Sequence, residues 1–176
     1  MNTKLVKVEK EYPDLQIMKE AGEILKNGGL VAFPTETVYG LGGDGLNARS
    51  SEKIYTAKGR PSDNPLIIHI ADMESLNKIV RQIPEKAKLL AEKFWPGPLT
   101  MIFQKSSEVP YETTGGLESV AVRMPNHPVA LALIQAGGGY IAAPSANTSG
   151  RPSPTKAEHV AEDLSGRIDM IVDGGD

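Results

Sequence analysis

The sequence contains no cysteine among its 176 residues. Disulfide bonds and thiolate metal sites are therefore excluded, and the composition fits a cytoplasmic protein. No apolar run approaches the roughly 18 residues that a membrane-spanning helix needs. The first residues, MNTKLVKVEKEYPD, lack the apolar core of a secretion signal. We therefore expect a protein without a membrane segment.

Aromatic residues and basic charge are also scarce. Aromatics make up 5% of the chain, and the formal net charge is −3. A protein whose whole surface binds nucleic acid carries an excess of Lys and Arg, and RNA readers stack bases on aromatic rings. These shortages argue against a surface devoted to nucleic acid, although a local basic patch remains open.

Glycine and proline are plentiful, at 18 and 13 residues, and they separate apolar runs along the whole chain. Apolar spacing predicts helices at 14–29, near 51–57, and at 73–80, 84–95, 127–138 and 155–166. Thr155 and Glu158 form a potential capping box for the last of these helices. Strands are predicted at 29–33, 65–71, 99–103, 119–124, 140–145 and 169–173, and the segment 34–47 is predicted as a polar loop.

The alternation of strands and helices indicates a single α/β domain. Residues 99–103 and 119–124 are joined by too short a connection for a crossover helix, so we expect them to pair antiparallel. The fold class is therefore α/β, with a mixed parallel and antiparallel sheet flanked by helices and a ligand pocket at strand ends.

Three polar segments are candidates for that pocket. Pro34–Thr37 and Pro144–Asn147 each follow a predicted strand, and AKGRPSDNP places Lys58 and Arg60 one residue apart in a predicted loop. Two cations in a loop indicate an anionic ligand. Ser, Thr and Asn also favour turns for their own hydrogen bonds, and spacing alone favours that simpler interpretation.

Familiar motifs explain little of the chain. The string GLGGDG at 40–45 resembles a dinucleotide-binding turn, but Asp63, at the right distance, lies within a loop rather than at the end of a strand. No Walker lysine motif is present. His127 and His159 are interpreted as structural, and His69 as a histidine of the core. The three histidines lack metal-ligand spacing, so no protein metal site is predicted.

No serine–histidine pair, cysteine or carboxylate pair forms a nucleophilic apparatus. A site of cations, hydroxyls and amides suits a reaction between two bound substrates, as in phosphoryl and nucleotidyl transfer, where positioning and charge neutralisation dominate catalysis. Two cations and several hydroxyls could hold a triphosphate without a P-loop.

Four segments, PTETVYGLG, KGRPSDNPL, VAVRMPNHP and APSANTSGRPSPT, together resemble the YrdC family of L-threonylcarbamoyladenylate synthases. The family's Lys-x-Arg and Ser-x-Asn signatures correspond to Lys58-Gly59-Arg60 and Ser145-Ala146-Asn147. The resemblance implies a twisted YrdC-like domain over 1–176. It also implies that this domain is incomplete at its C-terminal end, because the family continues through further nucleotide-binding segments.

The activity implied by the resemblance is the reaction of L-threonine, bicarbonate and ATP to threonylcarbamoyl-AMP and pyrophosphate. A partner threonylcarbamoyl transferase complex would use the product to modify tRNA. By motif position, Lys58 and Arg60 are the catalytic residues, and Mg²⁺ would be carried by the ATP phosphates. The implied ATP-binding residues are Lys58, Arg60, Asn64, Ser119, Ser145, Asn147 and Ser153. The implied threonine-binding residues are Thr35, Thr37, His69, Arg123 and the backbone at Ala143.

Two other functions stay open at this stage. One is a double-stranded RNA or tRNA-binding module without its own catalysis, which would make at least weak contact with RNA. The other is a carbamoyl-handling domain of the kind found in larger maturation proteins, although those carry zinc-binding cysteine segments.

Overall fold

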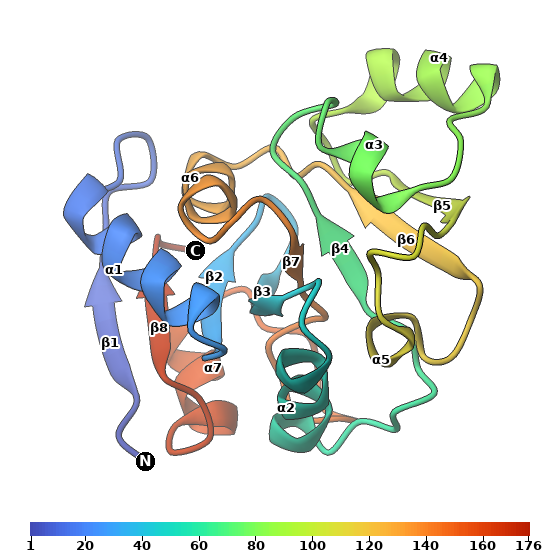
Figure 1. Ribbon diagram of the computed structural model, residues 1–176. Coiled ribbons are helices and arrows are strands. Elements are labelled where there is room, and N and C mark those ends of the chain that lie inside the picture. Colours follow the sequence, from blue (N-terminus) through green and yellow to red (C-terminus); the bar gives the residue numbers. More distant parts are fainter.

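The computed structural model describes all residues from Met1 to Asp176. Eight strands form one mixed sheet with helices on both faces (Figure 1). Their order across the sheet is β1-β8-β2-β3-β7-β4-β6-β5. The strands are β1 (Lys4–Lys7), β2 (Val31–Pro34), β3 (Tyr39–Asp44), β4 (Ile67–His69), β5 (Thr100–Gln104), β6 (Ser119–Arg123), β7 (Ile141–Ala142) and β8 (Met170–Asp173).

The sheet mixes parallel and antiparallel pairs, as the sequence predicted. β1, β8 and β2 run parallel, and β4 runs parallel to β6. β3 pairs antiparallel with both β2 and β7, and β7 pairs antiparallel with β4. The predicted antiparallel pairing of β5 with β6 is confirmed, with Met101 opposite Val122.

Most of the predicted helices are present. The helices are α1 (Leu15–Lys26), α2 (Ala48–Lys58), α3 (Leu76–Ile79), α4 (Glu85–Phe94), α5 (Tyr111–Thr114), α6 (Pro128–Ala136) and α7 (Ala157–Leu164). Side chains cap three of them. Asp14 accepts hydrogen bonds at the start of α1, Asn47 does so at the start of α2, and His127 Nδ1 accepts from the Val129 N–H at the start of α6. His127 thus has the structural role predicted for it.

The structure corrects the prediction for the segment 34–47. Its second half forms the buried strand β3, because the glycines there are packing positions rather than a nucleotide-binding turn. A Cβ on Gly42 would lie 2.9 Å from Ile141 Cγ2 and equally close to the Phe33 ring. The GLGGDG string therefore fits against its neighbouring strands.

Three smaller predictions were wrong. α7 begins after Lys156 without any side-chain cap, so the Thr155–Glu158 capping box does not form. α2 extends through Lys58, which is therefore helical rather than in a loop. The sequence analysis also missed β1, whose exposed residues Lys4 and Lys7 flank only a short apolar pair at the sheet edge.

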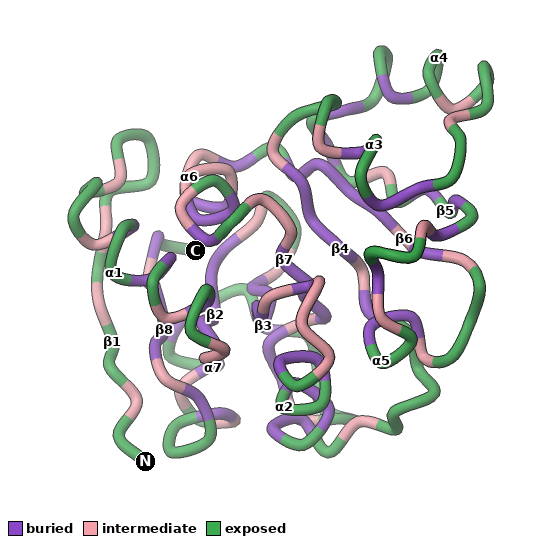
Figure 2. The backbone as a smooth tube through the Cα atoms, in the orientation of Figure 1, coloured by how far each residue is buried: buried purple, intermediate pink, exposed green.

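The core consists of apolar clusters on the two faces of the sheet and around its far edge. Side chains of β2 alternate between the faces: Val31 and Phe33 pack with α1 and α6, whereas Ala32 packs with α2 and α7. A third cluster surrounds β4, β5 and β6 beneath α3 and α4. The central strands are accordingly buried along their length (Figure 2). None of the helices is long and apolar enough to cross a membrane.

Candidate active site

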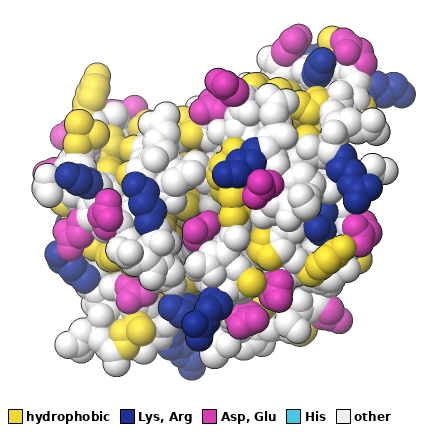
Figure 3. Space-filling view, viewed as in Figure 1, with side chains coloured by type: hydrophobic (Ala, Val, Ile, Leu, Met, Phe, Trp, Pro, Cys, Tyr) yellow, Lys and Arg dark blue, Asp and Glu magenta, His cyan; other side chains and the backbone are white.

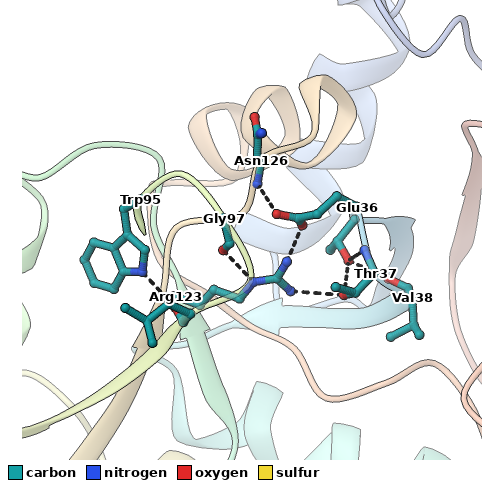
Figure 4. Close-up of polar contacts among 9 residues, drawn as sticks. Glu36, Thr37, Val38, Trp95, Gly97, Arg123 and Asn126 are labelled. Carbon is teal, nitrogen blue, oxygen red and sulfur yellow. Dashed lines mark hydrogen bonds and ion pairs between the residues drawn. The ribbon is translucent and has the colours of Figure 1, made fainter. Parts of the chain in front are cut away.

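The first cluster of polar residues is centred on Arg123, the last residue of β6 (Figure 4). Only 9% of its side chain is exposed. Arg123 Nε donates to the Gly97 carbonyl at 3.1 Å, and Nη1 donates to Thr37 Oγ1 at 3.4 Å. Nη2 donates to the Glu36 carboxylate. These contacts fix the guanidinium at the loop that follows β2.

The loop after β2 folds around its two threonines. The hydroxyls of Thr35 and Thr37 are 3.0 Å apart and hydrogen-bonded, and Thr35 Oγ1 also donates to the Val38 carbonyl at 2.7 Å. Glu36 lies between them in sequence, and its Oε2 accepts from the Asn126 N–H at 2.8 Å. Residues far apart in sequence therefore converge on Arg123. Together with His69 we call them the Arg123 group: Thr35, Glu36, Thr37, His69 and Arg123.

His69 joins this group through the sheet. It ends β4, stands opposite Arg123 in the parallel β4–β6 ladder, and presents its ring edge-on to Phe33 at 6.4 Å between centroids. Its ring is buried, and this burial, with the charge of Arg123 adding to it, lowers the pKa of His69 to about 4. His69 is therefore uncharged at neutral pH.

The second cluster is centred on Lys58, which is only 3% exposed at the last position of α2. Its Nζ donates to the carbonyl of Ser145 and, at 2.7 Å, to the carbonyl of Asn147. No carboxylate lies within ion-pair distance. Burial is the main cause that lowers the pKa of Lys58, to about 8, and the charge of Arg60 lowers it further. Lys58 is therefore a buried cation held by backbone carbonyls rather than by an acidic side chain.

Arg60 lies just beyond Gly59, which caps α2 with a φ of +66°. Its Nε donates to the Asn64 carbonyl at 3.3 Å and its Nη2 to the Pro65 carbonyl at 2.9 Å. Arg60 likewise has no carboxylate partner within ion-pair distance. The Lys58 group is defined as Lys58, Arg60, Asn64, Ser145 and Asn147.

Asn147 is the residue of this group with an unused acceptor. Its Nδ2 donates to the carbonyls of Thr148 and Arg151, both at 2.8 Å, while its buried Oδ1 has no hydrogen-bond partner. Buried polar atoms are normally paired.

The remaining predicted residues lie further from these contacts. Ser119 begins β6 opposite Gln104, and Ser153 is exposed on the segment before α7. The side chains of Lys58 and Arg60 donate no hydrogen bond to either serine. The Ala143 N–H is already used by the Ile67 carbonyl at 2.9 Å. The backbone atom of Ala143 that stays available is therefore its carbonyl.

A large groove of about 1190 Å³ lies elsewhere, between α1, α2 and the ends of β1 and β8, and is lined by residues such as Lys19, Arg49 and Arg167. None of the predicted site residues lines this groove. No set of three His, Cys, Asp or Glu side chains is arranged to hold a metal ion.

Glu36 is the functional candidate that sequence reasoning missed. Its motif, PTETV, was recognised, but only the two threonines were assigned to a ligand. The signal that could have identified it is a single carboxylate between two hydroxyls in a loop after a buried strand, in a site that also contains a buried arginine.

The chain resembles known proteins in sequence and in fold. Residues 23–176 match the Sua5/YciO/YrdC family, which is described as telomere recombination. The chain belongs to the Sua5/YciO/YrdC family. The match covers the Lys58 group and the Arg123 group alike.

Two curated members of the Sua5/YciO/YrdC family are close in sequence. A threonylcarbamoyl-AMP synthase of Pyrococcus abyssi is 54% identical over 99% of this chain and 51% of its own length. One of Bacillus subtilis is 60% identical over 89% of this chain and 45% of its own length. This chain thus spans about half the length of these relatives.

A solved structure of the family confirms the fold. The crystal structure of P. abyssi Sua5 in complex with L-threonine superposes with a TM-score of 0.96 at 53% identity, covering 99% of this chain and 51% of that one. The α/β fold predicted from the YrdC resemblance is therefore confirmed.

Proposed function

We propose that this domain synthesises threonylcarbamoyl-AMP from L-threonine, bicarbonate and ATP. The observation that carries the proposal is the presence, in one fold, of two sites of different kinds, each with a buried cation. One is the buried Arg123 beside hydroxyls, which suits a small carboxylate ligand, and the other is the Lys58 group, whose cations have no carboxylate partner. The names of the relatives support the same reaction.

The threonine half of the reaction is assigned to the Arg123 group and the Ala143 carbonyl. A guanidinium binds a carboxylate bidentately, and the Thr35 and Thr37 hydroxyls offer polar contacts nearby. The neutral His69 leaves Arg123 as the cation that receives the substrate. The substrate amine attacks bicarbonate, water leaves, and an N-carboxy derivative of threonine results.

The ATP half is assigned to the Lys58 group together with Ser119 and Ser153. An oxygen of the new N-carboxylate attacks the α-phosphorus, and the bond from that phosphorus to the pyrophosphate oxygen breaks. Lys58 uses two of its three N–H donors on backbone carbonyls, so the third is available for a phosphate oxygen. Lys58 and Arg60 would neutralise charge that develops on the phosphates.

Magnesium fits this site as an ion carried by the nucleotide, because the chain offers hydroxyls and amides there rather than a carboxylate cage. When bound, it would supply further charge neutralisation at the phosphates. The product would pass, in the cytoplasm, to a threonylcarbamoyl transferase complex that modifies tRNA. Acidic and basic side chains are interspersed on the face shown in Figure 3, which offers little support for an RNA-binding module.

The test is the release of pyrophosphate from ATP, measured with all substrates and with threonine or bicarbonate omitted in turn. We expect release to require both. An Arg123→Gln variant should lose most of the pyrophosphate release that threonine stimulates. Arg49→Gln, on the exposed face of α2, serves as a matched control and should keep it. Equal release without threonine would overturn the proposal in favour of an ATPase. RNA binding without any release would favour the RNA-binding module.

A further inference from the structure

The Glu36 carboxylate occupies part of the hydrogen-bonding edge of the Arg123 guanidinium. Its Oε1 accepts from Arg123 Nη2, while its Oε2 accepts from the Asn126 N–H at 2.8 Å (Figure 4). The other two guanidinium nitrogens also donate: Nε to the Gly97 carbonyl and Nη1 to the Thr37 hydroxyl. Three of the five guanidinium N–H donors are thus in use. A carboxylate that binds bidentately through the N–H of Nη2 now bonded to Glu36 would displace Glu36 from it.

Glu36 also sets the charge of the Arg123 group. Arg123 contributes one positive charge and Glu36 one negative charge, while His69 is neutral at physiological pH. His127 faces the same loop, and burial lowers its pKa as well. Lys10 and Glu11, which act on His127, have opposite charges. The group thus carries no net charge.

A neutral group built from two opposite charges suits a ligand built in the same way. Resting on the function proposed above, we infer that Glu36 makes the site selective for zwitterionic amino acids, yielding Arg123 to the substrate carboxylate and accepting the substrate ammonium itself. Glu36 is thereby a specificity-determining residue. Its side chain is 24% exposed, in contrast to the 9% of Arg123, so it is the partner with room to move.

A carboxylic acid that lacks the ammonium group would add a net negative charge to the Arg123 group. It would also displace Glu36, but it would leave two carboxylates beside a single guanidinium. Like charges at close range disfavour one another, and the displaced Glu36 would lack a cationic partner. Glu36 therefore acts against ligands that Arg123 alone would accept.

The experiment compares L-threonine with β-hydroxybutyrate, which is threonine without its amino group, by titration calorimetry on the wild type and on Glu36→Gln. We expect the wild type to prefer threonine strongly. In Glu36→Gln the preference should shrink at least about tenfold, because loss of one charge-assisted hydrogen bond weakens threonine while removal of the repulsion strengthens β-hydroxybutyrate. Glu11→Gln, which removes an exposed carboxylate that, like Glu36, acts on His127, should keep the wild-type preference.

The alternatives give distinct results. An unchanged preference in Glu36→Gln would overturn the inference and leave Glu36 as a structural ion-pair partner. Tighter binding of both ligands by equal factors would also overturn it, because Glu36 would then be only a competitor for Arg123. A wild type that binds no threonine would instead overturn the proposed function. Melting curves of the three proteins identify any loss of folding.

Discussion

The Arg123 group and the Lys58 group each hold a buried cation, but they surround it differently. Arg123 meets a carboxylate from a neighbouring loop, so its charge is balanced within the chain. Lys58 meets only backbone carbonyls, and burial lowers its pKa to about 8. Burying a charge without a counter-charge costs free energy, which the hydrogen bonds of Lys58 to the two carbonyls offset.

This difference indicates what each group is built to bind. A balanced pair can exchange partners with a zwitterion of similar size without changing the net charge of the site. An unbalanced Lys58, helped by Arg60, gains most from a ligand that brings several negative charges. The two groups therefore correspond to an amino acid and a polyphosphate, and the comparison can be tested by changing one group at a time.

The largest effect is expected for Lys58→Met, which keeps the length of the side chain but removes its charge. ATP affinity should fall about a hundredfold, as expected for loss of a strong charge-assisted contact. The free energy of unfolding should fall by about 1–3 kcal/mol, because the Ser145 and Asn147 carbonyls lose their donor. Calorimetric titration and urea unfolding measure the two effects.

Lys53→Met is the matched control, since Lys53 is an exposed lysine on the same helix that donates to the Gly28 carbonyl at 2.8 Å. It should leave ATP affinity unchanged. If Lys58→Met binds ATP as well as the wild type does, the Lys58 group is structural and the comparison between the two groups fails.

The next effect concerns pH and the neutral His69 beside Arg123. Its pKa in the folded chain is about 4, below the ordinary value of 6.5, so the unfolded chain binds more protons between these limits. Stability due to the neutral ring is therefore complete above pH 6.5 and is lost as the pH falls toward 4, by up to about 3 kcal/mol. Below pH 4 this contribution should not decline further.

Unfolding by urea at pH 7, 6, 5 and 4 tests this expectation. His69→Gln should show a shallower loss of stability with acid than the wild type, whereas His159→Gln, which removes an exposed histidine of α7, should follow the wild type. Parallel curves for all three proteins would mean that His69 does not titrate differently on folding. The Arg123 group would then not depend on a neutral ring.

Much of the architecture could be predicted from local patterns. The spacing of Leu15, Met18, Ala21 and Leu25 predicts one apolar face of α1, and the strand signals of β4 and β6 likewise depend on short-range periodicity. The structure confirms these elements and buries Met18, Ala21 and Leu25, but it leaves Leu15 exposed. β3 was missed because its glycines resemble a turn, and only the distant Phe33 and Ile141 explain why a side chain cannot fit. The reason for glycine at Gly42 therefore lies in residues of the neighbouring strands, which the local sequence does not show.

The contacts within the candidate site were likewise hidden from local sequence patterns. Motifs identified Arg123 and Lys58, but Glu36, the ion-pair partner of Arg123, is 87 positions away in sequence, and the carbonyls that Lys58 contacts are 87 and 89 positions away. Glu36 was left unassigned because its role depends on a contact between the loop after β2 and the last residue of β6. The burial of Lys58 was likewise hidden, since a lysine followed by Gly59 has the sequence pattern of an exposed loop.

The smallest effect is expected for Arg60→Ala, at the exposed margin of the Lys58 group. ATP affinity should fall about tenfold, since Arg60 adds charge but its loss leaves Lys58 in place. Folding should change by no more than about 0.5 kcal/mol, because the Asn64 and Pro65 carbonyls that Arg60 contacts belong to exposed residues and can bond to water instead. Threonine titrated alone should bind as before.

Two further variants make this result specific. Arg60→Lys should recover only part of the ATP affinity, because an ammonium cannot reproduce the planar fork of the guanidinium. Arg49→Ala, an exposed arginine at the start of α2, should leave ATP affinity unchanged. If Arg60→Ala keeps full ATP affinity while Lys58→Met loses it, the polyphosphate is held by Lys58 alone. If instead Arg60→Ala weakens threonine as much as ATP, the two groups form one charge system and their assignment to separate ligands fails.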